Sequence, residues 1–153
     1  MIGKEGNIVS PRRVIERLIE AGDLEGLLYR AGMLHGHLCP HLAYGVLAGY
    51  AAMRILGVKN TGMEEVVAIV ETNNCFSDGV QMVTGCTFGN NALIFRDLGK
   101  TAVTVVKRDG SAVRISLDPD FENSRMKQYP EAYALWDKVV VKREDVSVED
   151  QRR

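Results

Sequence analysis

The segment HGHLCPH, residues 35–41, contains all three histidines of the chain and one of its three cysteines. Within it, ligand-forming residues alternate at His35, His37 and Cys39. In extended backbone, alternate side chains project from the same side, so these three would form one array. Imidazole and thiolate together suit zinc, nickel, iron or copper. The sequence therefore predicts a transition-metal site, and His41 either joins it or merely caps or packs the following helix.

Both candidate cysteine ligands stand at expected helix starts. Cys39 precedes Pro40, a residue favoured in the first turn of a helix, and so occupies a predicted N-cap. A thiol there faces the positive end of the helix dipole, and we expect its pKa to fall. Cys75 follows a buried strand, where sites are common in open α/β sheets. Two thiolates at two helix N-termini would bind a soft divalent metal tightly.

Three further residues near the second cysteine are candidates for chemistry. Asp78 shares a helix face with Cys75 and would ligate, orient a histidine, or act as an acid or base. Gln81 is a candidate substrate contact. Cys86, in the glycine-bracketed loop GCTFG, is another ligand, a reactive thiol or a small buried residue. Each has an ordinary structural interpretation, so it is the cluster that favours a site.

Helix signals dominate the first third of the chain. Ser10 and Pro11 predict a helix that ends at Gly22, and Asp23 caps a second. A third is predicted over residues 40–56. Its small residues would let another backbone approach closely, either from a sheet or from a second subunit; they are Ala43, Gly45, Ala48, Gly49, Ala51 and Ala52.

The remaining elements predict a small sheet. Residues 66–71 (VVAIVE) form an apolar run typical of a strand buried on both faces. A short helix over 75–83 follows. Residues 101–107 and 112–117 flank Asp109-Gly110, a strong hairpin signal. A helix is expected over 130–138, then an extended VVVK. The pattern predicts an α+β fold with N-terminal helices, a mainly antiparallel sheet and a buried small-residue helix, in one domain over 1–153.

Composition narrows the classes of function. The net charge of -1 predicts no nucleic-acid or anionic-membrane partner. There is no apolar run of spanning length and no signal-peptide pattern, so a cytoplasmic location is expected. An odd number of widely spaced cysteines argues against a disulfide framework.

The blocks HGHLCP, VETNNCFSDGVQMVTGCTFGN and DLGKTAVTV occur in an order that resembles the FmdE family of formylmethanofuran dehydrogenase, over roughly residues 30–107. The resemblance implies an α+β fold, a homodimer and a metal site in a cleft. Among the motif positions, Cys39 and Cys75 with one or both of His35 and His37 are expected to hold the metal. Zinc is the first candidate, and nickel or iron are alternatives. The other motif positions carried over are Asp78, Gln81, Cys86, Thr87, Asp97 and Lys100.

Within that resemblance, Gln81, Thr87 and Lys100 are expected substrate or anion contacts. Two positions depart from the family pattern: His41 replaces a glycine, and Asn90 replaces a lysine. The chain also resembles a short stand-alone member, without the cysteine-rich, zinc-ribbon-like extension of many members.

Three functions stay open at this point. The first is a metal-binding accessory or cofactor-related protein, with a molybdenum enzyme as a partner. The second is a small metal- or thiol-dependent enzyme with an open coordination position and a small-molecule substrate. In the third, a structural or interaction domain, the histidines and cysteines are core residues.

Overall fold

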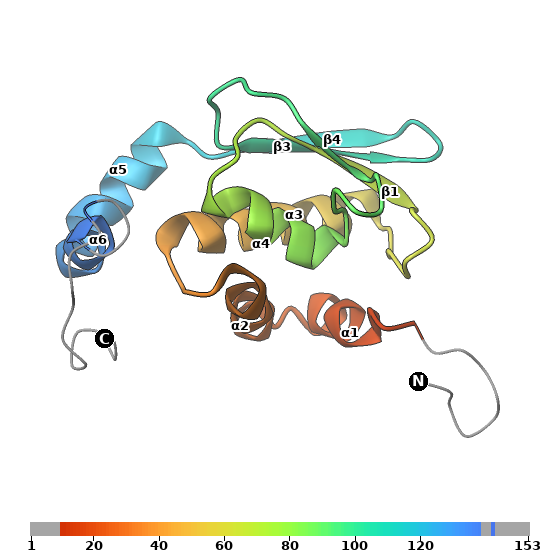
Figure 1. Ribbon diagram of the computed structural model, residues 1–153, viewed down its shortest axis with the longest axis horizontal. Helices are drawn as coiled ribbons and strands as arrows, with labels where there is room; N and C mark the ends of the chain where they lie inside the picture. Colours follow the sequence, from red (N-terminus) through yellow and green to blue (C-terminus); the bar gives the residue numbers. More distant parts are fainter. Residues whose placement is uncertain (1–9, 139–141, 143–153) are drawn as a thin grey trace. The chain divides into compact units, whose positions relative to one another are not determined.

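A four-stranded sheet forms one face of the first of two compact units, into which the chain divides between Ser116 and Leu117. The computed structural model describes residues 10–138 and 142 (Figure 1), and each unit is described by itself. The strands are β1 (Val66–Val70), β2 (Leu93–Phe95), β3 (Ala102–Lys107) and β4 (Ala112–Ser116), in the order β2-β1-β3-β4. Only the β1–β2 pair is parallel, so the predicted mainly antiparallel sheet is confirmed.

The central strand β1 is covered more completely on one face than on the other. Val66, Ala68 and Val70 are fully buried, whereas the intervening Val67 and Ile69 are half-buried. The prediction of burial on both faces is therefore met on one face only within the first unit. The physical reason is that the helices pack against a single side of this sheet.

Four helices form two layers beneath the sheet (Figure 1). Helices α3 (Pro40–Leu56) and α4 (Cys75–Thr84) pack directly below the strands, and α1 (Arg13–Ala21) and α2 (Leu24–His35) lie beyond them. The Asp23 carboxylate accepts the Gly26 N–H at 2.8 Å, which confirms the predicted cap of α2. Helix α1 begins two residues later than Pro11 suggested.

Helix α3 contacts strands β3 and β4, as the sequence suggested. Its two glycines, Gly45 and Gly49, face α4, a helix that the sequence did not suggest as the partner. A Cβ added to Gly45 would lie 2.0 Å from the carbonyl oxygen of Phe76. On the opposing helix, a Cβ on Gly79 would lie 2.5 Å from the Leu42 carbonyl oxygen. The two backbones therefore touch at a pair of glycines. Further along, Gly49 faces Val83, so the helices run in the same direction.

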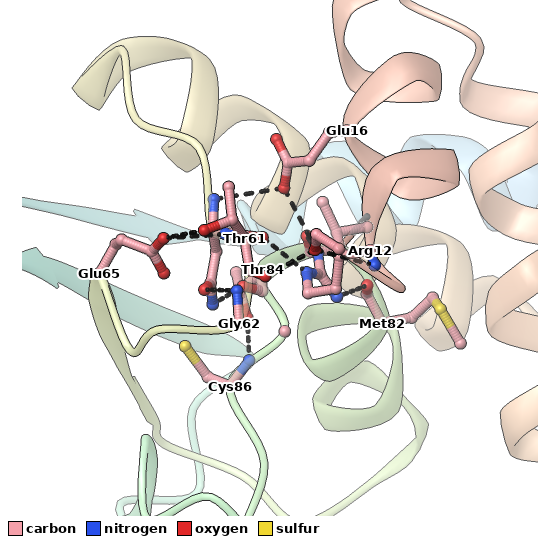
Figure 2. A network of polar contacts seen from close by, with 12 residues as sticks. Arg12, Glu16, Thr61, Gly62, Glu65, Met82, Thr84 and Cys86 are labelled. Carbon is pink, nitrogen blue, oxygen red and sulfur yellow. Dashed lines mark hydrogen bonds and ion pairs between the residues drawn. The ribbon is translucent and has the colours of Figure 1, made fainter. Parts of the chain in front are cut away.

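A buried polar network joins α1 to the other end of α4 (Figure 2). The Arg12 guanidinium donates to the backbone oxygens of Asn60, Met82 and Val83 at 3.0, 3.2 and 2.6 Å. The last carbonyls of a helix have no partner within the helix, so Arg12 satisfies the end of α4. Glu16 lies 3.8 Å from the same guanidinium and accepts the Asn60 N–H.

The second unit contains α5 (Pro119–Gln128) and α6 (Pro130–Trp136). The sequence predicted α6 but not α5, although Pro119 stands at the first position of α5, where proline is favourable. Asp118 caps α5 by accepting the Asp120 N–H. The predicted extended segment VVVK falls largely on residues 139–141, outside the described residues. Among the described helices, none is long and apolar enough to cross a membrane.

The contact between α3 and α4 gives a stability prediction. Alanine has a higher helix propensity than glycine by up to about 1 kcal/mol, so Gly45→Ala would be stabilising if space allowed. The added Cβ would instead meet backbone, and we expect a net loss of about 1–3 kcal/mol in the free energy of unfolding. Urea denaturation in the presence of a chelator measures this loss without a contribution from bound metal.

Gly89→Ala is the matched control for that substitution. The nearest heavy atom to its added Cβ would be the Thr87 hydroxyl oxygen, at 3.8 Å. Its unfolding midpoint should stay close to that of the unmodified protein. Equal midpoints for both variants would show that the two helix backbones are not in contact.

Candidate metal centre

Four side chains from three helix ends converge beside the first turns of α3 and α4. One ligand atom from each of His35, His37, Cys39 and Cys75 lies within 4.8 Å of the others. His35 is the last residue of α2, Cys39 is the N-cap of α3, and Cys75 is the first residue of α4. The four predicted metal ligands are therefore brought together, in an arrangement that could hold one ion.

The backbone that brings the histidines close to the cysteines has a different conformation from the one that the sequence suggested. The extended strip predicted over residues 35–39 is wrong, because His35 is helical. Gly36 then adopts a left-handed φ of 95°, which glycine tolerates without steric cost and which ends α2. This turn carries His37 back beside His35, and their ring centroids are 4.3 Å apart.

The Cys39 thiol occupies the predicted N-cap and accepts the Leu42 N–H at 3.4 Å. Its pKa, however, is raised to about 11, because burial disfavours the thiolate more than the hydrogen bond from Leu42 favours it. The neighbouring Cys75 thiol raises the pKa further. The expected fall in the Cys39 pKa is therefore wrong for the metal-free protein.

Asp78 orients one of the histidines. Its Oδ2 lies 2.7 Å from Nδ1 of His35, and Gln81 donates to its Oδ1 at 2.9 Å. Ionised carboxylate can only accept, so this contact uses an N–H on Nδ1 of His35, and in the neutral ring the lone pair is then on Nε2. That Nε2 is buried and has no hydrogen-bond partner among the described residues. An uncompensated buried acceptor is costly unless something binds it, and a metal ion fits this donor set.

His37 is the exposed member of the four. Loss of solvent around its ring, and then the nearby His35, lower the pKa of His37. The shift favours neutral imidazole, the form that coordinates metals. His41, by contrast, is not in the group of four; it lies edge-on to Tyr44, with ring centroids 5.9 Å apart.

The other predicted site residues lie outside this group. Cys86 is fully buried at the far end of α4, and its thiol donates to the Val66 carbonyl at 3.4 Å. Burial raises the pKa of Cys86. Asn90 donates to the Thr87 hydroxyl and to the Gly85 carbonyl, so the residue that departs from the family pattern closes this loop. Lys100 is exposed near Glu71, whose carboxylate binds Arg114.

With this geometry in place, comparison with known proteins identifies the family. The family model described as "FmdE, Molybdenum formylmethanofuran dehydrogenase operon" matches residues 34–153. The chain belongs to the FmdE family. The match begins one residue before His35 and so includes the whole group of four.

Two individual proteins are similar to this FmdE-family chain. A protein of Archaeoglobus fulgidus, named "Probable S-adenosyl-L-methionine-binding protein", is 49% identical over 135 residues, which cover 85% of this chain and 36% of that protein. The crystal structure of a tungsten formylmethanofuran dehydrogenase FmdE-like protein from Syntrophus aciditrophicus matches with a TM-score of 0.53 at 26% identity, over 84% of this chain and 65% of that one. The chain thus spans about a third of the curated relative.

The pair formed by Asp78 and His35 gives the first prediction for the site. In Asp78→Asn, an amide N–H directed at His35 would favour a proton on Nε2 and block coordination. Loss of such an orienting carboxylate costs about 10- to 100-fold in metal affinity. Chelator competition with zinc measures the loss. Glu25→Gln, which removes an exposed carboxylate from the start of α2, should leave the affinity unchanged; an equal loss in both variants would indicate a general charge effect.

The raised pKa of Cys39 gives the second prediction for the site. With a pKa of about 11, this thiol is protonated at neutral pH, and metal binding must expel its proton. Raising the pH therefore favours the bound state, and the zinc dissociation constant should fall at least about tenfold per pH unit between about pH 7 and pH 9. Chelator competition at fixed ionic strength measures this dissociation constant at each pH. An affinity that does not change with pH would mean that the thiolate exists before the metal binds.

Proposed function

We propose that this FmdE-family protein holds one divalent transition metal at His35, His37, Cys39 and Cys75, with zinc as the first candidate. The observation that carries the proposal is the buried, partnerless Nε2 of His35, held toward the other ligands by Asp78. Two thiolates and two imidazoles are a common tetrahedral zinc set. Nickel and iron also accept nitrogen and sulfur ligands and stay as alternatives.

The charge of the ligand set supports a divalent ion. Two thiolates neutralise the ion, while the imidazoles are neutral. Both thiolates also lie at helix N-termini, where partial positive charge stabilises anions. The Asp78 carboxylate then adds one negative charge beside the site, partly balanced because His35 shares its proton with it. When bound, the metal supplies a Lewis-acidic centre.

For the biological role, we propose an accessory or cofactor-related protein that works with a molybdenum or tungsten enzyme. The family description and the related FmdE-like structure support this role. The Archaeoglobus relative is described as binding S-adenosylmethionine, but this chain matches only 36% of its length. Calorimetry with S-adenosylmethionine would decide whether the shared part binds it.

The second candidate is a small metal-dependent enzyme. It is favoured by the exposure of two residues at the edge of the site: the Asp78 side chain is 36% exposed, and His37 is exposed. In that case Asp78 would hold or move a proton beside the metal. Four protein ligands favour a structural or storage role, whereas three ligands and a water favour chemistry. X-ray absorption spectroscopy of the zinc-loaded protein distinguishes the two coordination sets.

Ligand substitution tests the metal site directly. Cys39→Ser and Cys75→Ser should each abolish stoichiometric metal in protein purified without added zinc, because hydroxyl is a far weaker ligand than thiolate for a soft divalent ion. Elemental analysis by mass spectrometry measures metal per chain and also identifies the metal.

Cys86→Ser is the matched control, because it replaces the same sulfur atom by oxygen in a cysteine that lies outside the group of four. It should keep one metal per chain. Retention of full metal by all three variants would refute the ligand assignment. Loss of metal in the Cys86 variant alone would place the site elsewhere.

A further inference from the structure

We infer that His37 is the exchangeable ligand of the proposed metal site, and that a neutral donor from a small molecule or from water takes its place. The inference rests on the proposed metal site and deepens it. Its basis is a difference among the four side chains: three are fixed by neighbouring groups, and one is not. Exchange would turn a closed site with four protein ligands into an open site with three.

The three other ligands are each held in place. The His35 ring is fixed by Asp78, which Gln81 holds in turn, and its side chain is only 14% exposed. Cys39 is buried and accepts the Leu42 N–H.

Cys75 is the first residue of α4, and the start of that helix is itself fixed. The Asn74 side chain accepts the Phe76 N–H at 3.0 Å, and the Ser77 hydroxyl donates to the Thr72 carbonyl at 2.6 Å. Moving the His35 ring or the Cys39 thiol away from the metal would therefore break a hydrogen bond. Moving the backbone of Cys75 would undo the start of α4.

His37 has no comparable support. It makes no hydrogen bond within the described part of the chain, and its ring contacts that of His35. It follows Gly36, where nothing lies within 4 Å of the position that a Cβ would occupy. Leu38, which follows, is 61% exposed. Rotation of the His37 side chain into solvent therefore breaks no hydrogen bond of the described residues; it separates the two rings and, when metal is present, breaks one coordination bond.

The charge around the metal selects the incoming donor. A divalent ion with two thiolates is neutral, so an anion in place of His37 would leave a net negative centre. That centre would stand beside the Asp78 carboxylate, which lies 2.7 Å from His35. Like charges in a partly desolvated site repel strongly. A neutral nitrogen or thioether donor, or water, leaves the balance unchanged.

Cobalt substitution tests the inference, because the visible spectrum of Co²⁺ reports its ligands without any assay of activity. His37→Ala should retain one Co²⁺ per chain, with an affinity loss no greater than the roughly 10- to 100-fold that removal of an orienting partner costs. Added imidazole should return its spectrum toward that of the unmodified protein, whereas sodium azide at equal concentration should not.

His35→Ala is the matched control, since it removes the same ring from the supported position. It should lose stoichiometric Co²⁺, and imidazole should not restore it. The unmodified protein loaded with zinc gives an independent reading: excess imidazole should shift the NMR signals of the His37 ring and leave those of His35 in place.

The outcomes separate the two proposals. An unmodified protein that binds no Co²⁺ would refute the proposed metal site itself. Binding by the unmodified protein with equal loss in both histidine variants would overturn the exchange of His37 alone. So would an unchanged spectrum for His37→Ala, since His37 would then not be a ligand. Azide that binds as well as imidazole would overturn the preference for a neutral donor.

Discussion

The contact between the backbones of α3 and α4 is the constraint on which the site depends. Glycines at positions 45 and 79 let the two helices approach until a Cβ on either would collide with the other's main chain. Because the helices run in the same direction, their N-termini lie side by side, and Cys39 is therefore close to Cys75. A larger residue at either glycine would separate the helices and so the two thiols. The packing of α3 on α4 and the proposed metal site therefore depend on the same backbone contact, although the glycines lie several residues from the candidate ligands.

Two opposing effects act on the thiols at these helix ends. The helix N-termini favour thiolate, and the Leu42 N–H donates to Cys39. Burial and the second thiol act in the other direction and prevail, since the pKa of Cys39 is raised. Sulfur is a weak hydrogen-bond acceptor, which explains why one N–H contact does not offset desolvation. The described residues supply no full positive charge beside the two thiols that would stabilise their thiolate forms. A divalent ion in the proposed site would supply the positive charge that stabilises both thiolates.

The sequence predicted the elements with strong local signals and missed those that depend on distant contacts. The bounds of α3 were predicted correctly because Pro40 and Gly57 mark its ends. Strand β2 was not predicted, because three residues carry little periodicity and its pairing with β1 is made across the intervening α4. The four candidate ligands were predicted from residue type, spacing and the family resemblance, and the structure brings them together. The expectation that Asp78 orients a histidine agrees with its hydrogen bond to His35. The turn at Gly36 was missed, since alternation of His35, His37 and Cys39 is equally compatible with a strand and with a helix end followed by a loop.

Alternation in the sequence made the two histidines look equivalent, and the fold makes them different. His35 is on a helix and reaches Asp78, a residue 43 positions away that is brought near by the packing of α4 on α2. His37 is two residues later, beyond a glycine that releases it from the helix. With one fixed and one loosely held imidazole, the proposed site would have four protein ligands when His37 is bound and three when it is displaced. Asp78 holds His35, and Gly36 separates His37 from the helix. In the proposed metal site, an entering ligand would therefore compete only with His37.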